Sequence, residues 1–195
     1  MTPRRRLLRS LPIVGLVVAC VGTGTLAAFS SASSNAGNTV AAGTVQLADN
    51  DAGAAVVPLP AAAPGQSSSG CIAVTYNGTL SAGVRLFATL GGSLAPHLTL
   101  TVTRGTQAAP AFNSCTGFTP DAANYIGAGP GVVFNGALSG FPTSYASAIA
   151  DAPGAPETWT TGERHVYRFV VTLGGSLAAQ GLSQTATFTW EARNL

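Results

Sequence analysis

Apolar and polar residues alternate along five segments of the chain, and many of the polar positions are threonine. In residues 97–104, Leu98, Leu100 and Val102 fall on one face and three threonines fall on the other. The same period of two runs through residues 71–76, 83–90, 165–173 and 184–192. Because alternate side chains of a strand point to opposite faces, this pattern predicts half-buried strands of antiparallel sheets.

Weaker strand signals and a long irregular region complete the expected fold. Further strands are predicted at residues 39–47, around residues 56–57 and at residues 132–138. The Gly- and Pro-rich residues 106–162 are expected to form an irregular edge, with a short helix in residues 142–151. Together these elements predict one all-β domain, an antiparallel β-sandwich.

The heptapeptide TLGGSLA occurs twice, at Thr89–Ala95 and at Thr172–Ala178. Each copy follows an alternating segment and precedes another one, and its glycine pair allows the chain to reverse. The repeat indicates two similarly built strand–turn–strand units that face each other in the sandwich. Coincidence in a sequence rich in Ala, Gly, Leu, Ser and Thr is the alternative.

The N-terminal residues have the pattern of an export signal. Four arginines in residues 4–9 precede a short apolar run at residues 11–21, and Thr25 and Ala27 are small residues suited to a cleavage site. The run is too short to span a membrane, which takes ~20 residues. We therefore expect a signal peptide in residues 1–27, which contacts the membrane only before cleavage.

Signal peptidase would cut between Ala27 and Ala28, which leaves residues 28–195 as one secreted domain at the cell surface or outside the cell. Two other export routes fit the same residues. Val17–Cys20 resembles a lipobox, which would leave Cys20 as a lipidated N-terminus, and the arginines loosely match a twin-arginine signal.

Removal of the signal changes the charge of the chain. All nine basic residues are Arg, and loss of the four in the signal leaves five against seven acidic residues. The mature chain is therefore slightly acidic and has no basic cluster interleaved with aromatics, which argues against a nucleic-acid partner. Charged residues make up only 8% of the sequence, which favours a β-protein with Thr and Ser on its outer faces.

Cys71 and Cys115 are the two cysteines that follow the signal. In an exported protein such an isolated pair is expected to form a disulfide. The bond would tether the irregular middle of the chain to the sandwich, and it requires a Cα–Cα distance of ~4.4–6.8 Å.

Candidate chemistry is sparse. The sequence has no zinc-protease helix motif, nucleophile elbow or phosphate-binding loop, so we expect no cofactor and no enzymatic activity. His97, Glu163 and His165 are the candidate metal ligands. Asp49–Gly53 begins like a calcium loop, but Pro60 stands where such a loop needs its last carboxylate, so a simple turn is favoured.

The residues around the cleavage site carry a family resemblance. Ala-Phe-Ser at residues 28–30 is followed by Asn35-x-Gly37-Asn38 and by Ala-Gly-Thr-Val-x-Leu at residues 42–47. Together with the Thr-rich strands, this resembles the TasA/camelysin-like family of exported bacterial proteins, which carry a SipW-dependent type of signal peptide. The resemblance implies a jelly-roll-like sandwich at the cell surface or in the extracellular matrix. The best-known members assemble into biofilm fibres, and camelysin is described as a surface metalloprotease.

The first hypothesis is therefore a structural subunit that associates with itself or with other matrix or surface components. Its flexible mature N-terminus, residues 28–38, would add as a strand to the sheet edge of a neighbour. Phe29 would fill a pocket, and Asn35, Gly37 and Asn38 belong to the same assembly segment; a leader without a role is the alternative.

Two other hypotheses remain open. A camelysin-like metallo-endopeptidase would use His97, Glu163 and His165, although the sequence lacks a standard zinc-protease motif. A module that binds carbohydrate or another surface would use Trp159, which lies in the long irregular region.

Overall fold

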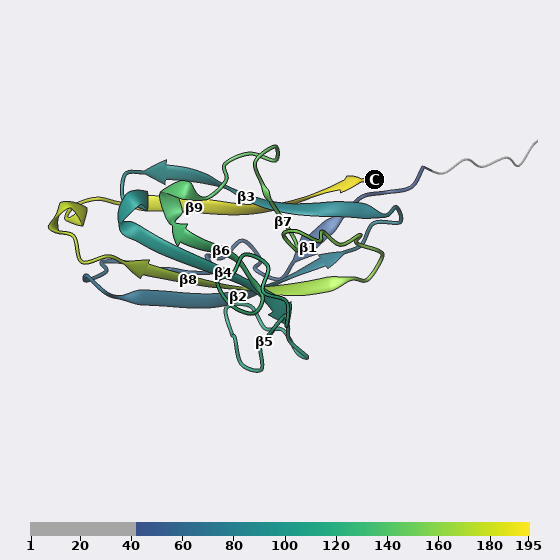
Figure 1. The fold of residues 1–195 in the computed structure, drawn as a ribbon, viewed down its shortest axis with the longest axis horizontal. Coiled ribbons are helices and arrows are strands. Elements are labelled where there is room, and N and C mark those ends of the chain that lie inside the picture. Colours follow the sequence, from purple (N-terminus) through teal and green to yellow (C-terminus); the bar gives the residue numbers. More distant parts are fainter. Residues whose placement is uncertain (1–41) are drawn as a thin grey trace, which may run out of the picture. The chain divides into compact units, whose positions relative to one another are not determined.

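The computed structural model describes residues 42–195, which form an antiparallel β-sandwich of two layers (Figure 1). One sheet has the order β1-β2-β8-β4-β5, with β6 also paired to β4, and the other has the order β7-β3-β9. The strands are β1 (Leu47–Asp49), β2 (Ser67–Tyr76), β3 (Ala82–Gly92), β4 (Leu98–Thr106), β5 (Thr119–Pro120), β6 (Val132–Ala137), β7 (Ile149–Ala150), β8 (Arg164–Leu173) and β9 (Gln184–Asn194). Three short 3-10 turns, η1 (Ala95–His97), η2 (Leu138–Gly140) and η3 (Leu177–Ala179), are the only helical elements of this region.

The predicted all-β sandwich is confirmed. The chain passes from one sheet to the other at β2–β3, β3–β4, β6–β7, β7–β8 and β8–β9, as expected of a jelly-roll-like sandwich. The expected signal helix, the cleavage site at Ala27 and Ala28, and the assembly residues Phe29, Asn35, Gly37 and Asn38 lie outside the described residues.

The five alternating segments all form strands. Leu98, Leu100 and Val102 of β4 are buried between the sheets, whereas Thr99 is exposed on the outer face. Tyr167 and the odd-numbered residues that follow it in β8 are buried in the same core. The period of two therefore located both the strands and their inner faces.

Three weaker predictions are wrong. Of the strand predicted at residues 39–47, residues 39–41 lie outside the described chain, residues 42–46 form no strand and only Leu47 belongs to one, β1. Residues 56–57 form no strand either, and two prolines follow them. Residues 142–151 form a turn and then β7 instead of a helix. The ring of Tyr145 in this turn stacks on the guanidinium of Arg193, 3.6 Å from its centroid, so a tertiary contact overrides the local helical pattern.

The two copies of the heptapeptide play the same role. The first carries the chain from β3 to β4 and the second from β8 to β9, and each leads into a 3-10 turn. They meet at one end of the sandwich, where Ser93 donates its backbone N–H to Ser183 at 3.0 Å and Gly174 donates to His97 at 2.8 Å. Gly92 has a φ of 109°, and a Cβ there would lie 2.3 Å from the Ser183 oxygen, so this glycine is required.

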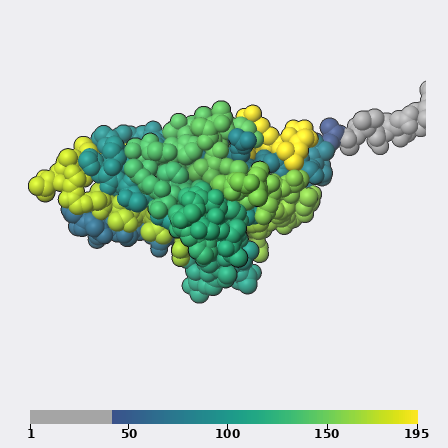
Figure 2. Space-filling model, in the orientation of Figure 1, coloured from purple at the N-terminus to yellow at the C-terminus, as the bar shows by residue number. Residues whose placement is uncertain are grey.

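The predicted disulfide joins Cys71 of β2 to Cys115, with a Cα–Cα distance of 5.2 Å that falls in the expected range. It anchors the loop after β4 over the outer face of β2 and β8, where Cys71, Ala73 and Val166 form a small buried cluster with Phe118. The space-filling view shows this part of the chain as a teal lobe at the lower edge (Figure 2). The irregular middle is therefore tethered as predicted.

Candidate functional site

Arg104 is the centre of a polar cluster inside the sandwich. It continues the inward-facing series of Leu100 and Val102 in β4, so its side chain points between the sheets, and the residue is 1% exposed. Tyr167 lies opposite Arg104 in the ladder between β4 and β8 and is also 1% exposed. A guanidinium at this depth needs several acceptors, because an unpaired buried charge is very costly.

Two distant segments supply these acceptors. Nη1 of Arg104 donates to Oδ2 of Asp121 and to the hydroxyl of Tyr125, at 2.8 Å each. Nη2 donates to Oε2 of Glu157 and lies 3.7 Å from Oδ2 of Asp151. The guanidinium therefore ties β4 to two separate parts of the long region between β4 and β8.

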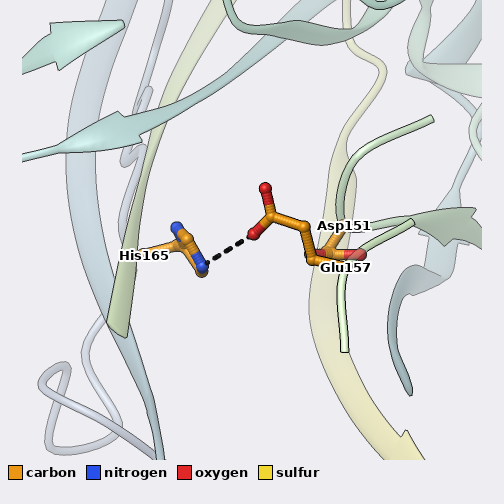
Figure 3. Close-up of side chains that lie close together, drawn as sticks. All are labelled: Asp151, Glu157 and His165. Carbon is orange, nitrogen blue, oxygen red and sulfur yellow. Dashed lines mark ion pairs between the residues drawn. The ribbon is translucent and has the colours of Figure 1, made fainter. Parts of the chain in front are cut away.

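His165 brings an imidazole into the same cluster from the start of β8. Its Nε2 lies 2.9 Å from Nη2 of Arg104, 3.1 Å from Oε1 of Glu163 and 3.5 Å from Oε2 of Glu157. Figure 3 shows the carboxylate of Glu157 directed toward the imidazole, with Asp151 behind it. The one nitrogen Nε2 is thus shared among a guanidinium and two carboxylates.

The cluster gathers most of the acidic residues of the chain. Four of the seven acidic residues and one of the two histidines belong to it. We call the following set the Arg104 cluster: Arg104, Asp121, Tyr125, Asp151, Glu157, Trp159, Glu163, His165 and Tyr167. Side-chain exposure rises from 1% at Asp151 to 45% at Glu157, so the cluster runs from the interior to the surface.

Arg104 is held in its charged form. Burial alone would lower the pKa of its guanidinium. The hydrogen bond to Glu157 and the charge of Asp121 outweigh this effect, and the pKa of Arg104 is raised above its usual value. Arg104 is therefore a permanent cation at the centre of the cluster.

The charged form of the Asp151 carboxyl, in contrast, is disfavoured by burial. Burial raises its pKa above the usual range, against the effects of the hydrogen bond from Trp159 and of the charge of Arg104. Burial and the charge of Asp151 likewise raise the pKa of Tyr167. The Tyr167 hydroxyl has no hydrogen-bond partner among residues 42–195. The inner part of the cluster therefore favours neutral over negative groups.

Asp151, Glu157 and His165 form the group in the described region whose ligand atoms are close enough to hold a metal ion, within 4.8 Å of one another. Two carboxylates and an imidazole are a ligand set suited to zinc. Nη2 of Arg104 lies among these three side chains and contacts two of them, so the space that an ion would need is taken by a guanidinium.

The predicted metal set of His97, Glu163 and His165 does not come together. Glu163 and His165 are hydrogen-bonded to each other at 3.1 Å, as their positions on one side of a strand start suggest. His97, however, lies at the far end of β8, where its carbonyl accepts from the backbone N–H of Gly174 at 2.8 Å. Nine residues of extended chain separate this point from His165, which is roughly 30 Å.

Trp159 does not serve as an exposed aromatic, so the predicted carbohydrate site at this residue is wrong. It is 0% exposed, and its backbone pairs with Ala82 at the start of β3. Its indole N–H donates to Asp151 at 2.7 Å, and its ring packs edge-on against His165, with 4.7 Å between the centroids. Because Trp159 lies in a region that the sequence predicts to be irregular, its burial in the core was not expected.

Asp49–Gly53 is a turn, as favoured. Oδ1 of Asp51 accepts from the backbone N–H of Gly53 at 2.6 Å, and Oδ1 of Asn50 accepts from Ala73 of β2 at 2.9 Å. These side chains are occupied by backbone amides of the turn and of the neighbouring strand.

A second candidate site lies along β9. This strand pairs with β3 on one side, and within residues 42–195 its other edge has no backbone hydrogen-bond partner. A cavity of about 830 Å³ opens beside its first half. We call this cavity the β9 slot; its lining includes Val57, Leu59, Leu98, Val171, Leu173 and Phe188.

The β9 slot exists because no strand covers that part of the core. Val56 lies over β2. Its carbonyl oxygen is so close to Gly70 that a Cβ added to Gly70 would lie 2.0 Å from that oxygen. The chain then continues through Pro58 and Pro60, which have no N–H to donate to a neighbouring strand. The segment therefore lines the slot but does not pair with β9.

The outer edge of β2 is protected, in contrast to that of β9. Beyond its pairing with β1, the Ala73 N–H donates to the Asn50 side chain at 2.9 Å, and the Cys71 carbonyl accepts from Asn113 at 2.8 Å. Residues 184–190 of β9 carry no charged side chain, whereas charges and covering loops commonly protect natural sheet edges. The first half of β9 is therefore suited to pair with an added strand.

Sequence reasoning missed the Arg104 cluster because its members are spread over residues 104–167 without a motif. One signal was available. In the alternating segment of β4, Arg104 occupies the position of an inward-facing residue after Leu100 and Val102. An Arg on the core face of a predicted strand indicates buried acidic partners.

No helix within residues 42–195 is long and apolar enough to cross a membrane. No family model matches the chain, and no curated protein matches it. The function is therefore inferred from the Arg104 cluster, from the β9 slot and from the resemblance carried by the N-terminal residues.

Proposed function

We propose that the chain is a secreted structural subunit of the cell surface or extracellular matrix, similar to TasA, that assembles with copies of itself by β-strand addition. The observation that carries this proposal is that one edge of β9 has no strand partner within residues 42–195 and lies beside the apolar β9 slot. An incoming strand would gain main-chain hydrogen bonds from β9 and bury alternate side chains in the slot.

The placement of the two ends of the domain suits a linear assembly. Ala42 lies near Leu80, at the end of the sandwich where β3 begins and β9 ends. The β9 slot lies at the opposite end, near Gly92 and Gln184, and the ten steps of β3 between these ends correspond to about 33 Å. A segment that leaves one end and enters the slot of the next copy makes a head-to-tail contact between two different surfaces, and such contacts build an open filament when the rotation between copies does not close a ring.

The fourteen residues 28–41 are the donor that we assign to the slot. They are uncharged and contain no proline, so every one of them can join a ladder. Phe29 supplies the large apolar side chain that a pocket of this kind accommodates. The resemblance to the TasA/camelysin-like family supports the same function.

The alternative functions receive less support from the geometry. A camelysin-like endopeptidase that uses His97, Glu163 and His165 would need residues from both ends of β8. A carbohydrate-binding module would need an exposed aromatic platform, and Trp159 is buried. Neither alternative has a specific observation in its favour.

A charge placed inside the slot tests the proposal. Ala186 of β9 lines the slot, whereas Thr187 is exposed and points away from it. In the mature chain that begins at Ala28, we expect A186E to abolish filaments and T187E to leave them intact. Electron microscopy and sedimentation at raised protein concentration measure the assembly, and circular dichroism checks that both variants are folded.

Shortening the donor is the second arm of the test. A chain that begins at Thr39 should remain monomeric under conditions in which the chain from Ala28 forms filaments. Equal assembly of both chains, or filaments of folded A186E, would overturn strand addition. A monomeric mature chain would mean that residues 28–41 fold back onto their own slot, and the structural-subunit proposal would fail.

A further inference from the structure

The Nη2 nitrogen of Arg104 occupies the position that a metal ion would take between three potential ligands. Nη2 donates to Oε2 of Glu157, lies 2.9 Å from Nε2 of His165 and lies 3.7 Å from Oδ2 of Asp151. The ligand atoms of these three side chains are within 4.8 Å of one another, and two carboxylates with one imidazole are a zinc-type set. A zinc ion at the place of Nη2 would need the His165 imidazole and the Asp151 carboxylate to close in by roughly 1–2 Å.

We propose that Asp151, Glu157 and His165 form a three-ligand cation site whose resident cation is the guanidinium of Arg104. Arg104 excludes divalent metal from the site, and its removal turns the site into one that binds zinc. The guanidinium thus has the role that a structural metal has in other small domains, because it holds separate segments of the chain together.

The geometry explains why the guanidinium does not leave. The Arg104 side chain is 2% exposed, and it extends from β4, which is paired on both sides. Its other nitrogen, Nη1, is fixed by Asp121 and Tyr125 at 2.8 Å each. A zinc ion would therefore have to displace a side chain that is anchored independently of the three ligands.

The surrounding charge explains why the emptied site would attract a divalent ion. Three carboxylates, those of Asp121, Asp151 and Glu157, pair with this one guanidinium, and the carboxylate of Glu163 is bonded to His165 beside it. Loss of the guanidinium therefore leaves a strongly negative, partly buried group. The indole N–H of Trp159 donates to Oδ2 of Asp151 at 2.7 Å, and an outer hydrogen bond of this kind orients a metal ligand. Two of the three ligands come from outside β8, so an ion would cross-link β8 to the segment that carries Asp151 and Glu157.

Zinc chloride titration of the full mature chain tests the proposal. We expect the wild type to bind no stoichiometric zinc through these residues and to show no zinc-dependent change in its melting temperature. R104A should be less stable, should bind one zinc ion per chain by calorimetry, and should gain about 5–10 °C in melting temperature at a hundred-fold excess over the dissociation constant. If R104A does not fold alone, zinc added during refolding should restore its circular dichroism spectrum.

Three matched variants identify the ligands. R104A/H165A should lose the zinc response, R104A/H97A should keep it, and R104K should show none because a cation still fills the site. A zinc site in the wild type that disappears in H165A would overturn the proposal. A response of R104A that survives in R104A/H165A, or an R104A chain that neither binds zinc nor refolds with it, would overturn it as well.

Discussion

The indole Nε1 of Trp159 donates a hydrogen bond to Oδ2 of Asp151 at 2.7 Å, and both residues are buried. Removal of the donor leaves a buried carboxylate with one acceptor unsatisfied, which costs about 1–3 kcal/mol. We expect W159F to be destabilised by at least this amount, as measured by urea denaturation. A double-mutant cycle with D151A should give a coupling energy of about 1 kcal/mol or more; additive effects would show that the hydrogen bond contributes nothing.

The raised pKa of Asp151 predicts a pH dependence of stability. Because burial raises this pKa, the folded chain binds the proton of Asp151 more tightly than the unfolded chain does. The stability that this carboxyl contributes is therefore greatest below its unfolded pKa, near the ordinary value of 3.8, and falls as the pH rises through the folded pKa. The free energy of unfolding of the wild type relative to D151N should thus increase from about pH 7 to about pH 4. A difference that stays constant across this range would contradict the shift.

The disulfide between Cys71 and Cys115 should account for a large part of the stability. Cross-linking two residues 44 positions apart is worth about 4 kcal/mol in the chain-entropy model. Guanidinium denaturation of C71A/C115A should show a loss of this order relative to the oxidised wild type. A thiol assay on the unfolded, unreduced mature chain should detect no free thiol, and two thiols per chain would contradict the bond.

Two glycines in strands provide a matched test of packing. A Cβ on Gly70 would lie 2.0 Å from the backbone carbonyl of Val56 and from the side chain of Asn113. The carbonyl cannot move without shifting the segment that lines the β9 slot, so G70A should lose roughly 1–3 kcal/mol. At Gly136 in β6 the nearest atom would be 3.6 Å away, so G136A should stay within about 0.5 kcal/mol of the wild type in urea denaturation. Equal stability of the two variants would mean that Val56 is not held against β2.

The five alternating strands were predictable because every second side chain in them packs into one core. Leu100 and Val102 are buried and Thr99 is exposed, so the chemistry of the sequence follows the two faces of β4 directly. The disulfide was predictable for a different reason, since Cys71 and Cys115 are the two cysteines outside the expected signal. Local pattern and simple counting were sufficient in both cases.

The candidate sites depend on contacts that local pattern does not record. Trp159 lies in a Gly- and Pro-rich stretch, and only its pairing with Ala82 brings it into the core. His165 meets Arg104 because β8 happens to lie beside β4 in the sheet. The β9 slot likewise follows from strand order, because β9 pairs with β3 on one side and the described chain supplies no second strand on its other side.

In the proposed filament, the position of the disulfide limits how far a subunit can stretch under load. Tension that enters at Ala42 acts first on β1, whose three residues pair with β2. Once β1 detaches, the chain can be drawn out as far as Cys71, where the bond to Cys115 stops it. The 29 residues from Ala42 to Cys71 span about 100 Å when fully extended. Each subunit would therefore act as an extensible link in which the disulfide keeps residues 72–114, with β3 and β4, out of the loaded path.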